Sequence, residues 1–278
     1  MAEKKPNALV TQRIEVTPGL IILRVVPEGW ELPEFHPGQY ATLGLPGTAP
    51  RCDGADPEER PPADLNKMIM RAYSIASSSL AREYLEFYVG LVRSGSLSTR
   101  LFRLRPGDRL WVSERFRGMF TLGEVPPEFN AVLIATGTGV APYMSMIRTE
   151  LASGLRRRFA VFHGAYHSYD LGYHSELSML AAVSPQFLYV PTLSHAHEEP
   201  VPWKGHQGFV QKLWTDGVLE QAWGFRPTAA NTHVFLCGNP YMIEELTEIL
   251  QKEGFAAHSS ASPGQIHSEQ FFVKSQAD

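Results

Sequence analysis

Cysteine is scarce in this sequence, which holds only Cys52 and Cys237 among 278 residues. Two cysteines that lie far apart cannot supply the four thiolates of a zinc or iron–sulfur site. We therefore expect no metal site. We also expect no disulfide, because a cytosolic chain works in a reducing compartment.

Three further absences narrow the class of protein. The net charge is −4, so the chain lacks the basic footprint of a nucleic-acid-binding protein. No apolar run approaches the length of a membrane span. Residues 1–7 lack the apolar stretch of a secretory signal. Together these absences predict a cytoplasmic protein with no nucleic-acid partner and no membrane span.

The length and the hydrophobic content of 44% are sufficient for two domains of ordinary size. The first half consists of short strand-like runs separated by turns, with one helix expected over 98–104. Many short strands with little helical periodicity favour an antiparallel barrel or sandwich. The runs that carry this prediction are 10–16, 20–26, 84–89 and 109–112.

The second half alternates between strands and helices. This alternation favours a parallel sheet with helices on both faces, where ligands bind beyond the carboxyl ends of the strands. The expected strands are 158–164, 187–190 and 233–237. The expected helices are 143–151, 173–183 and 241–252, with a further helix inside 207–223.

A glycine turn between a strand and a helix is the central motif of the chain. The apolar run 133–135 predicts a buried strand, and Thr136-Gly137-Thr138-Gly139 follows it. Pro142 suits the first turn of a helix. Free N–H groups and the helix dipole make such a turn a phosphate site, although a tight turn with no ligand is the alternative. Since Cys237-Gly238-Asn239-Pro240 also ends a strand, a nucleotide could be held between the two turns.

Three segments of the first half also stand out. Arg71 and Tyr73 share one face of a strand, where a guanidinium can bind phosphate and a ring can stack. The alternative is an exposed Arg beside a half-buried Tyr. Gly95–Thr99 is either a second anion-binding helix start or a plain N-cap formed by Ser96 or Ser98. Segment 48–66 is expected to be a mobile, solvated surface loop rather than a flap that contacts a partner.

Taken together, these motifs resemble the ferredoxin–NADP reductase superfamily, and within it the bacterial ferredoxin/flavodoxin–NADP(+) reductases. They occur in the family's order and cover nearly the whole chain. The matching residues are His36–Tyr40, Arg71–Ser74, Gly95–Thr99, Gly137–Pro142, Cys237–Pro240 and Glu269.

The resemblance implies a six-stranded antiparallel FAD-binding β-barrel over 1–126. It also implies an α/β NADP(H)-binding domain over 127–278, with a C-terminal tail on the flavin. The implied activity transfers a hydride between NADPH and FAD, and single electrons between FAD and ferredoxin or flavodoxin, in a monomer. An NADH-dependent flavin reductase component of an oxygenase is the first alternative. A non-enzymatic flavin-binding subunit is the second.

The resemblance also implies the residues of the site. Ser74, Cys237 and Glu269 would surround the point where hydride is transferred, and Tyr73 would stack on the flavin. Either Phe271 or Phe272 would cover the other face of the ring. The implied FAD-binding residues are Arg71, Ala72, Tyr73, Ser74, Tyr88, Val89, Leu91, Gly95, Ser96, Leu97, Ser98, Thr99, Thr138, Phe271 and Phe272. The implied NADP-binding residues are Thr136, Gly137, Gly139, Val140, Pro142, Ser194, His195, Lys204, Cys237, Gly238, Asn239, Pro240 and Met242.

One departure from the family concerns the choice of nucleotide. NADP-specific relatives place an arginine just after the strand that ends near Ser194, where it binds the 2′-phosphate. This chain has no arginine between Arg158 and Arg226. His195, Lys204 and His206 are the basic residues near that point, and we expect a modest preference for NADPH.

Overall fold

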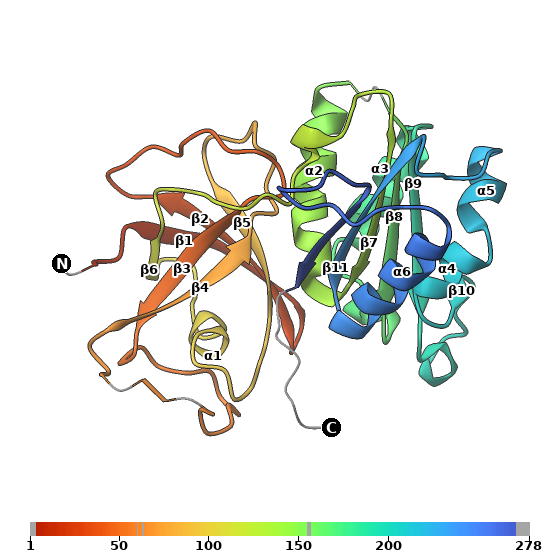
Figure 1. The fold of residues 1–278 in the computed structure, drawn as a ribbon. Coiled ribbons are helices and arrows are strands. Elements are labelled where there is room, and N and C mark those ends of the chain that lie inside the picture. The colour runs from red at the N-terminus through yellow and green to blue at the C-terminus, as the bar shows by residue number, and fades with distance from the viewer. Residues whose placement is uncertain (1–3, 60, 63, 155–156, 271–278) are drawn as a thin grey trace. The chain divides into compact units, whose positions relative to one another are not determined.

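The computed structural model describes residues 4–59, 61–62, 64–154 and 157–270. The chain divides into two units, and each is described by itself (Figure 1). Unit 1 comprises Met1–Thr121 together with Met144–Thr149, and unit 2 comprises Leu122–Tyr143 together with Glu150–Asp278.

Unit 1 is a six-stranded antiparallel barrel with the strand order β4-β3-β6-β1-β2-β5. The two edge strands of this order meet, because Ile75 bridges to Phe87 and the Ala76 amide donates to the Glu86 carbonyl at 2.8 Å. The expected barrel is therefore confirmed. Its elements are β1 (Ala8–Thr17), β2 (Leu20–Pro27), β3 (Tyr40–Pro46), β4 (Met68–Ser74), β5 (Leu85–Gly90), α1 (Ser98–Leu101) and β6 (Arg109–Val112).

The core of unit 1 follows from residues that point inward along these strands. Val10, Leu23, Leu43, Phe87 and Leu110 are fully buried and belong to one hydrophobic cluster. Burying such apolar surface contributes roughly 25 cal/mol per Å². This buried core stabilises the barrel, to which β4 and the turn after β5 belong.

Unit 2 is a six-stranded parallel sheet with the order β10-β9-β8-β7-β11-β12. Helices α4, α5 and α6 cover one face, where they share a hydrophobic cluster with β7, β8 and β11, and α3 lies on the other (Figure 1). Its strands are β7 (Asn130–Thr136), β8 (Phe159–Ala165), β9 (Phe187–Leu193), β10 (His206–Gln207), β11 (Thr232–Gly238) and β12 (Ile266–Gln270). Its helices are α3 (His174–Val183), α4 (Gln211–Thr215), α5 (Val218–Trp223) and α6 (Pro240–Lys252). Helix α2 (Ala141–Ala152) begins and ends in unit 2, whereas its residues 144–149 belong to unit 1.

The order of this sheet defines a switch point. The chain runs from β7 outward through β8 to β9, and then returns to place β11 on the other side of β7. Ligands of such sheets bind outside the carboxyl ends of the strands where the direction of winding reverses. The carboxyl ends of β7 and β11 are therefore where a ligand is expected, and both carry glycine turns.

Several expected elements need correction. The helix over 98–104 is shorter, since α1 ends at Leu101. The single helix expected inside 207–223 is two helices, because Gly217 adopts a left-handed φ of 68° between α4 and α5. Strands β10 and β12 were not predicted from the sequence.

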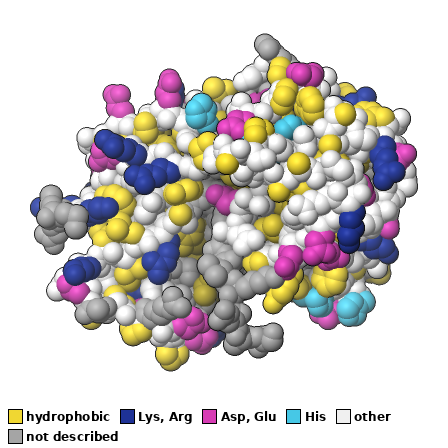
Figure 2. All heavy atoms as spheres, viewed as in Figure 1, with side chains coloured by type: hydrophobic (Ala, Val, Ile, Leu, Met, Phe, Trp, Pro, Cys, Tyr) yellow, Lys and Arg dark blue, Asp and Glu magenta, His cyan; other side chains and the backbone are white. Residues whose placement is uncertain are grey.

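Charge is evenly mixed on the face of the molecule that Figure 2 shows, where Lys and Arg side chains are interspersed with Asp and Glu. Within the described ranges, no helix is both long enough and apolar enough to cross a membrane. The same residues include no group of three or more His, Cys, Asp or Glu side chains arranged to hold a metal ion.

Candidate functional site

The two glycine turns of unit 2 pack directly against each other. A Cβ atom at Gly139 would clash with the Cys237 carbonyl oxygen, and one at Gly238 would lie 2.7 Å from the Thr136 carbonyl oxygen. The Asn239 amide donates to Thr136 Oγ1 at 2.8 Å. The two turns are therefore in direct contact at Gly139 and Gly238, and the nucleotide site expected at them stays a prediction.

That outer surface is open at Gly137. Its φ is +53°, and an added Cβ would meet nothing within 4 Å. A 3-10 turn over Gly137–Val140 leads into α2. The Tyr143 hydroxyl fixes the start of α2, since it lies 3.0 Å from the Ile134 carbonyl and 2.8 Å from the Phe235 carbonyl. The helix start is thereby tied to both β7 and β11.

Cys237 and Glu269 lie opposite each other in the pairing of β11 with β12. The Cys237 thiol is fully buried. Burial, and then the negative charge of Glu269, raise the pKa of this thiol well above its ordinary value. Cys237 is therefore a neutral thiol at physiological pH, beside a carboxyl group at the switch point.

A cluster of histidines and carboxylates lies at the carboxyl ends of β8 and β9. Ser194 Oγ is 2.9 Å from His195 Nδ1, and the His195 ring centre is 5.7 Å from that of His167. His167 Nε2 is 3.1 Å from Glu198 Oε2. The hydrogen bond that the Glu198 carboxylate accepts from His167 raises the pKa of His167, and the same bond lowers the pKa of Glu198.

A second carboxylate orders the loop that carries this cluster. Glu199 accepts hydrogen bonds from the Ser168 amide at 2.8 Å and from the Ser168 hydroxyl at 2.6 Å. Tyr166 packs edge-on against His195 with ring centres 5.0 Å apart. His195 was predicted as a site residue, whereas His167 and Tyr166 were not. Their place close after the predicted strand 158–164 was the one local signal, and their contacts with His195 form only in the folded sheet.

In unit 1, strand β4 carries Arg71, Tyr73 and Ser74. Arg71 is exposed, and its Nη1 donates to the Met70 carbonyl at 2.8 Å. The Tyr73 ring is half-buried against the barrel core, and burial raises the pKa of its hydroxyl, while Arg71 lowers it. Ser74 Oγ is buried and has no hydrogen-bond partner among the described residues.

The Gly95–Thr99 turn differs from the expected N-cap. Leu97 occupies the N-cap position and no side chain caps the helix. Ser98 Oγ instead accepts from the Val92 amide at 3.2 Å and donates to the Val92 carbonyl at 3.0 Å. Thr99 Oγ1 donates to the Gly95 carbonyl at 2.7 Å. These hydroxyls shape the turn, while the Leu97, Ser98 and Thr99 amides have no acceptor among the described residues.

Several predicted site residues have side chains in the hydrophobic cores. Such residues can offer only backbone groups to a ligand, and their assignment stays a prediction. They are Val89 and Leu97 in unit 1, and Val140 and Met242 in unit 2. Phe271 and Phe272 lie outside the described residues. Ser74 belongs to unit 1, whereas Cys237 and Glu269 belong to unit 2.

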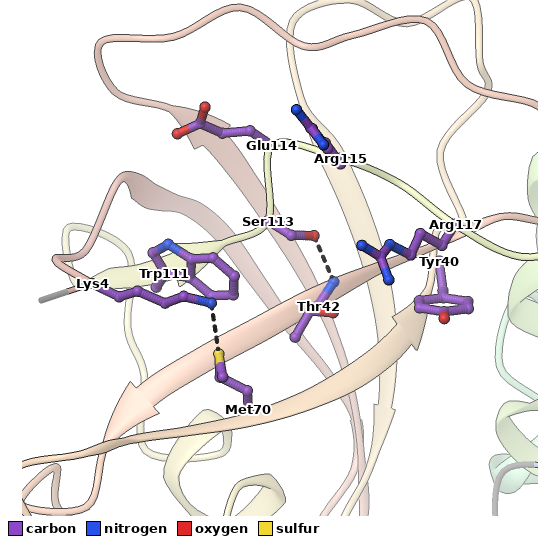
Figure 3. A pocket seen from close by; sticks show the side chains of 9 residues that line it. All are labelled: Lys4, Tyr40, Thr42, Met70, Trp111, Ser113, Glu114, Arg115 and Arg117. Atoms are coloured by element: carbon purple, nitrogen blue, oxygen red, sulfur yellow. Dashed lines mark hydrogen bonds between the residues drawn. The ribbon is translucent and has the colours of Figure 1, made fainter. Parts of the chain in front are cut away.

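Unit 1 also carries a pocket of about 470 Å³ lined from β3, β4, β6 and the residues after β6 (Figure 3). The Lys4 ammonium lies 3.9 Å above the centre of the Trp111 ring. Ser113 Oγ accepts from the Thr42 amide at 2.9 Å. None of the residues predicted to bind a cofactor lines this pocket.

Comparison with known proteins agrees with this geometry. Residues 133–248 match the family described as the oxidoreductase NAD-binding domain. The chain is 34% identical to ferredoxin–NADP reductase B of Sorangium cellulosum over 219 residues, which cover 79% of this chain and 80% of the relative. It is 30% identical to the flavodoxin/ferredoxin–NADP reductase of Escherichia coli over 211 residues, which cover 76% of this chain and 77% of the relative.

Among solved structures, the fold is similar to that of a ferredoxin NADP+ reductase from Neisseria gonorrhoeae with bound FAD and NADP. The TM-score is 0.79 at 24% identity, and the match covers 98% of this chain and 100% of that chain. At this identity the likeness establishes the fold. The barrel and the parallel sheet of our chain thus have a solved counterpart.

The part of the chain that holds the two glycine turns thus matches an oxidoreductase NAD-binding domain. More particularly, the chain belongs to the family of ferredoxin/flavodoxin–NADP reductases. The resemblance inferred from six motifs is thereby confirmed.

Proposed function

We propose that this chain is an FAD-dependent oxidoreductase that transfers a hydride between NADPH and FAD, and single electrons between FAD and ferredoxin or flavodoxin, in the cytoplasm. The contact between the glycine turns at the ends of β7 and β11 carries this proposal. These turns lie at the switch point of the sheet, where proteins of this fold bind nucleotides. The relatives of the chain are named as reductases of this kind.

The residues of unit 1 fit FAD. The buried Ser74 hydroxyl without a partner among the described residues can bond to a polar edge of the flavin ring. The amides of Leu97, Ser98 and Thr99 can donate to the pyrophosphate, which the exposed Arg71 guanidinium can also bind. We assign FAD to the barrel, residues 1–126, and NADP(H) to residues 127–278.

The bound flavin would supply the chemistry, since it accepts a hydride and gives up electrons one at a time. The protein positions and protects the reacting groups. Tyr73 offers a ring for stacking, and the Ser74 hydroxyl orients the flavin. The buried, neutral Cys237 thiol adds no charge beside the nicotinamide ring, while Glu269 holds negative charge or a proton there.

One observation favours the alternative, an NADH-dependent flavin reductase component of an oxygenase. Two carboxylates, Glu198 and Glu199, lie in the cluster where a 2′-phosphate would have to bind. A carboxylate there repels a phosphate and can instead accept a hydrogen bond from the 2′-hydroxyl of NADH. His195, His167 and Lys204 oppose this effect, and we retain NADPH as the donor.

The experiment is to purify the protein, extract its cofactor, and then supply NADPH with a ferredoxin or a flavodoxin. We expect FAD as the extracted cofactor and reduction of the one-electron carrier at a rate that depends on carrier concentration. FMN as the extracted cofactor would contradict the assignment of the Leu97–Thr99 amides. Carrier reduction by NADH but not by NADPH would establish the alternative.

A further inference from the structure

The segment that follows β3 runs alongside the turn predicted to bind the FAD pyrophosphate. Its Cys52 amide donates to the Thr99 carbonyl at 2.8 Å, its Asp56 amide to the Arg93 carbonyl at 3.0 Å, and its Glu59 amide to the Ser94 carbonyl at 3.3 Å. These bonds join the first part of segment 48–66, expected to be a mobile, solvated loop, to the turn. We call residues 47–59 the strap.

Side chains reinforce these backbone bonds along the strap. Ser94 Oγ donates to Glu59 Oε1 at 2.7 Å, and Arg93 Nε pairs with Asp56 Oδ2 at 3.3 Å. Arg51 Nε donates to Thr99 Oγ1 at 3.1 Å, and Arg51 Nη2 donates to the Arg93 carbonyl at 3.0 Å. Contacts therefore join the strap to the 93–99 region at both of its ends.

One buried ion pair joins Glu58, near the end of the strap, to Arg100, which directly follows the turn. Arg100 Nη1 donates to Glu58 Oε1 at 2.5 Å and to the Ser96 carbonyl at 2.6 Å, while Nη2 donates to the Gly47 carbonyl at 2.7 Å. The Arg100 and Glu58 side chains are only 4% and 9% exposed. A single guanidinium thus connects both ends of the strap with the turn, and removing its carboxylate would leave a buried, uncompensated charge.

The charges of the strap and the turn do not sum to a positive charge. The strap carries four carboxylates, Asp53, Asp56, Glu58 and Glu59, against the three guanidinium groups of Arg51, Arg93 and Arg100. Ion pairs join Arg93 to Asp56, and both Arg51 and Arg100 to Glu58. The strap therefore adds no net attraction for an anion. Its contribution is geometric, because it fixes the conformation of the Gly95–Thr99 backbone, whose amides face the proposed ligand.

We propose that the strap holds the Gly95–Thr99 turn in the conformation that retains the FAD pyrophosphate, and that the Glu58–Arg100 pair is its latch. This inference rests on the proposed function. Glu58 and Arg100 are positioning residues, since they act through the turn. The turn is assigned to the pyrophosphate, so breaking the Glu58–Arg100 pair should speed the dissociation of FAD. The affinity for FMN, which has no pyrophosphate, should remain nearly unchanged.

The test compares the wild-type protein with Glu58→Gln and with a control, Glu28→Gln. Glu28 pairs with Arg109 on the surface of the same barrel, where the two side chains are 36% and 57% exposed. Three quantities are measured: hydrogen exchange of the Cys52, Asp56 and Glu59 amides, the rate of FAD dissociation, and the affinity for FMN.

We expect Glu58→Gln to speed exchange at these amides and FAD dissociation by about tenfold or more, with FMN affinity changed less than about twofold. Glu28→Gln should leave all three unchanged. Should Glu58→Gln fail to fold, Arg51→Lys provides the second variant, with smaller changes expected in the same direction.

Faster amide exchange with unchanged FAD dissociation would overturn the inference, because the strap would then not be coupled to the cofactor. Equal losses of FAD and FMN would also overturn it, since they indicate a general structural role. A wild-type protein that binds no flavin would instead defeat the proposed function, and the inference with it. Exchange at the strap amides, measured without flavin, separates the two failures.

Discussion

Cys237 on β11 and Glu269 on β12 are register partners in parallel strands, so a buried thiol and a carboxyl group lie side by side at the switch point of the sheet. Both burial and this carboxylate raise the pKa of the thiol. The thiol of this pair is therefore neutral at physiological pH.

The first prediction concerns thiol reactivity. Only the thiolate reacts with iodoacetamide, so the buried Cys237 should be alkylated at least about a hundredfold more slowly than the partly exposed Cys52 at pH 8. Mass spectrometry of digests from timed reactions gives the two rates. Both cysteines should react equally in the unfolded chain, and equal rates in the folded protein would contradict the raised pKa.

Gly139 and Gly137 provide a matched pair for a test of stability. Gly139→Ala would place a methyl group against the Cys237 carbonyl, which is backbone and cannot move aside without shifting β11. We expect a loss of about 3 kcal/mol in the free energy of unfolding. At Gly137 an added methyl group would meet open space. Gly137→Ala should therefore lower the free energy of unfolding by only about 1 kcal/mol, because alanine is less stable than glycine in the left-handed conformation. Urea denaturation measures both, and equal losses would contradict the direct packing of the two turns.

Two buried histidines make the stability of unit 2 sensitive to acid. His233 Nδ1 is 2.9 Å from His267 Nε2. Burial, then His258 and His233, lower the pKa of His267 from 6.5 to about 3. Between these values the unfolded chain binds more protons than the folded chain, so the free energy of unfolding should fall as the pH drops below about 6.5.

The variant for this prediction is His267→Phe. It retains a ring to stack on Phe235, where the centres are 4.3 Å apart, but it cannot titrate. Its free energy of unfolding, measured in urea at several pH values, should vary less between pH 6.5 and pH 5 than that of the wild type. The exposed His206 supplies the control His206→Gln, with an unchanged slope. An unchanged slope in His267→Phe would show that other groups cause the acid sensitivity.

Nucleotide choice is predicted from the cluster at the ends of β8 and β9. We expect a modest preference for NADPH that strengthens from pH 8 to pH 6, because protonated imidazoles attract the 2′-phosphate. His195→Arg and Glu198→Gln should each raise the preference about tenfold, and Lys204→Ala should lower it. The measurement is the ratio of kcat/KM for NADPH to that for NADH. A wild-type ratio below one would favour the NADH-dependent alternative.

Local sequence pattern was sufficient for most elements of the fold. Strand β6 begins and ends at Arg109 and Val112, as predicted from the turn before it and its apolar residues. The edge strand β12 was missed because its residues, Ile-His-Ser-Glu-Gln, lack a clear apolar pattern. It forms by pairing with β11, a contact that depends on the folded sheet.

In the candidate site, too, local motifs could be predicted from the sequence, whereas contacts between distant segments could not. The glycine turns and Arg71 could be identified from motifs. His167 was missed because it approaches His195 and Glu198 only after β8 and β9 pair. The bonds of the strap could not be predicted, because its prolines and acidic residues are typical of solvated loops, whereas its partners Thr99 and Arg100 are distant in the sequence.

Hydride transfer from NADPH to a bound flavin is the activity proposed for this chain. The most direct test is anaerobic stopped-flow mixing of the purified protein with NADPH or NADH, followed by flavin absorbance. We predict that NADPH bleaches the flavin within a single turnover and that NADH does so more slowly. A protein without flavin absorbance, or with a flavin that neither nucleotide bleaches, would contradict the account.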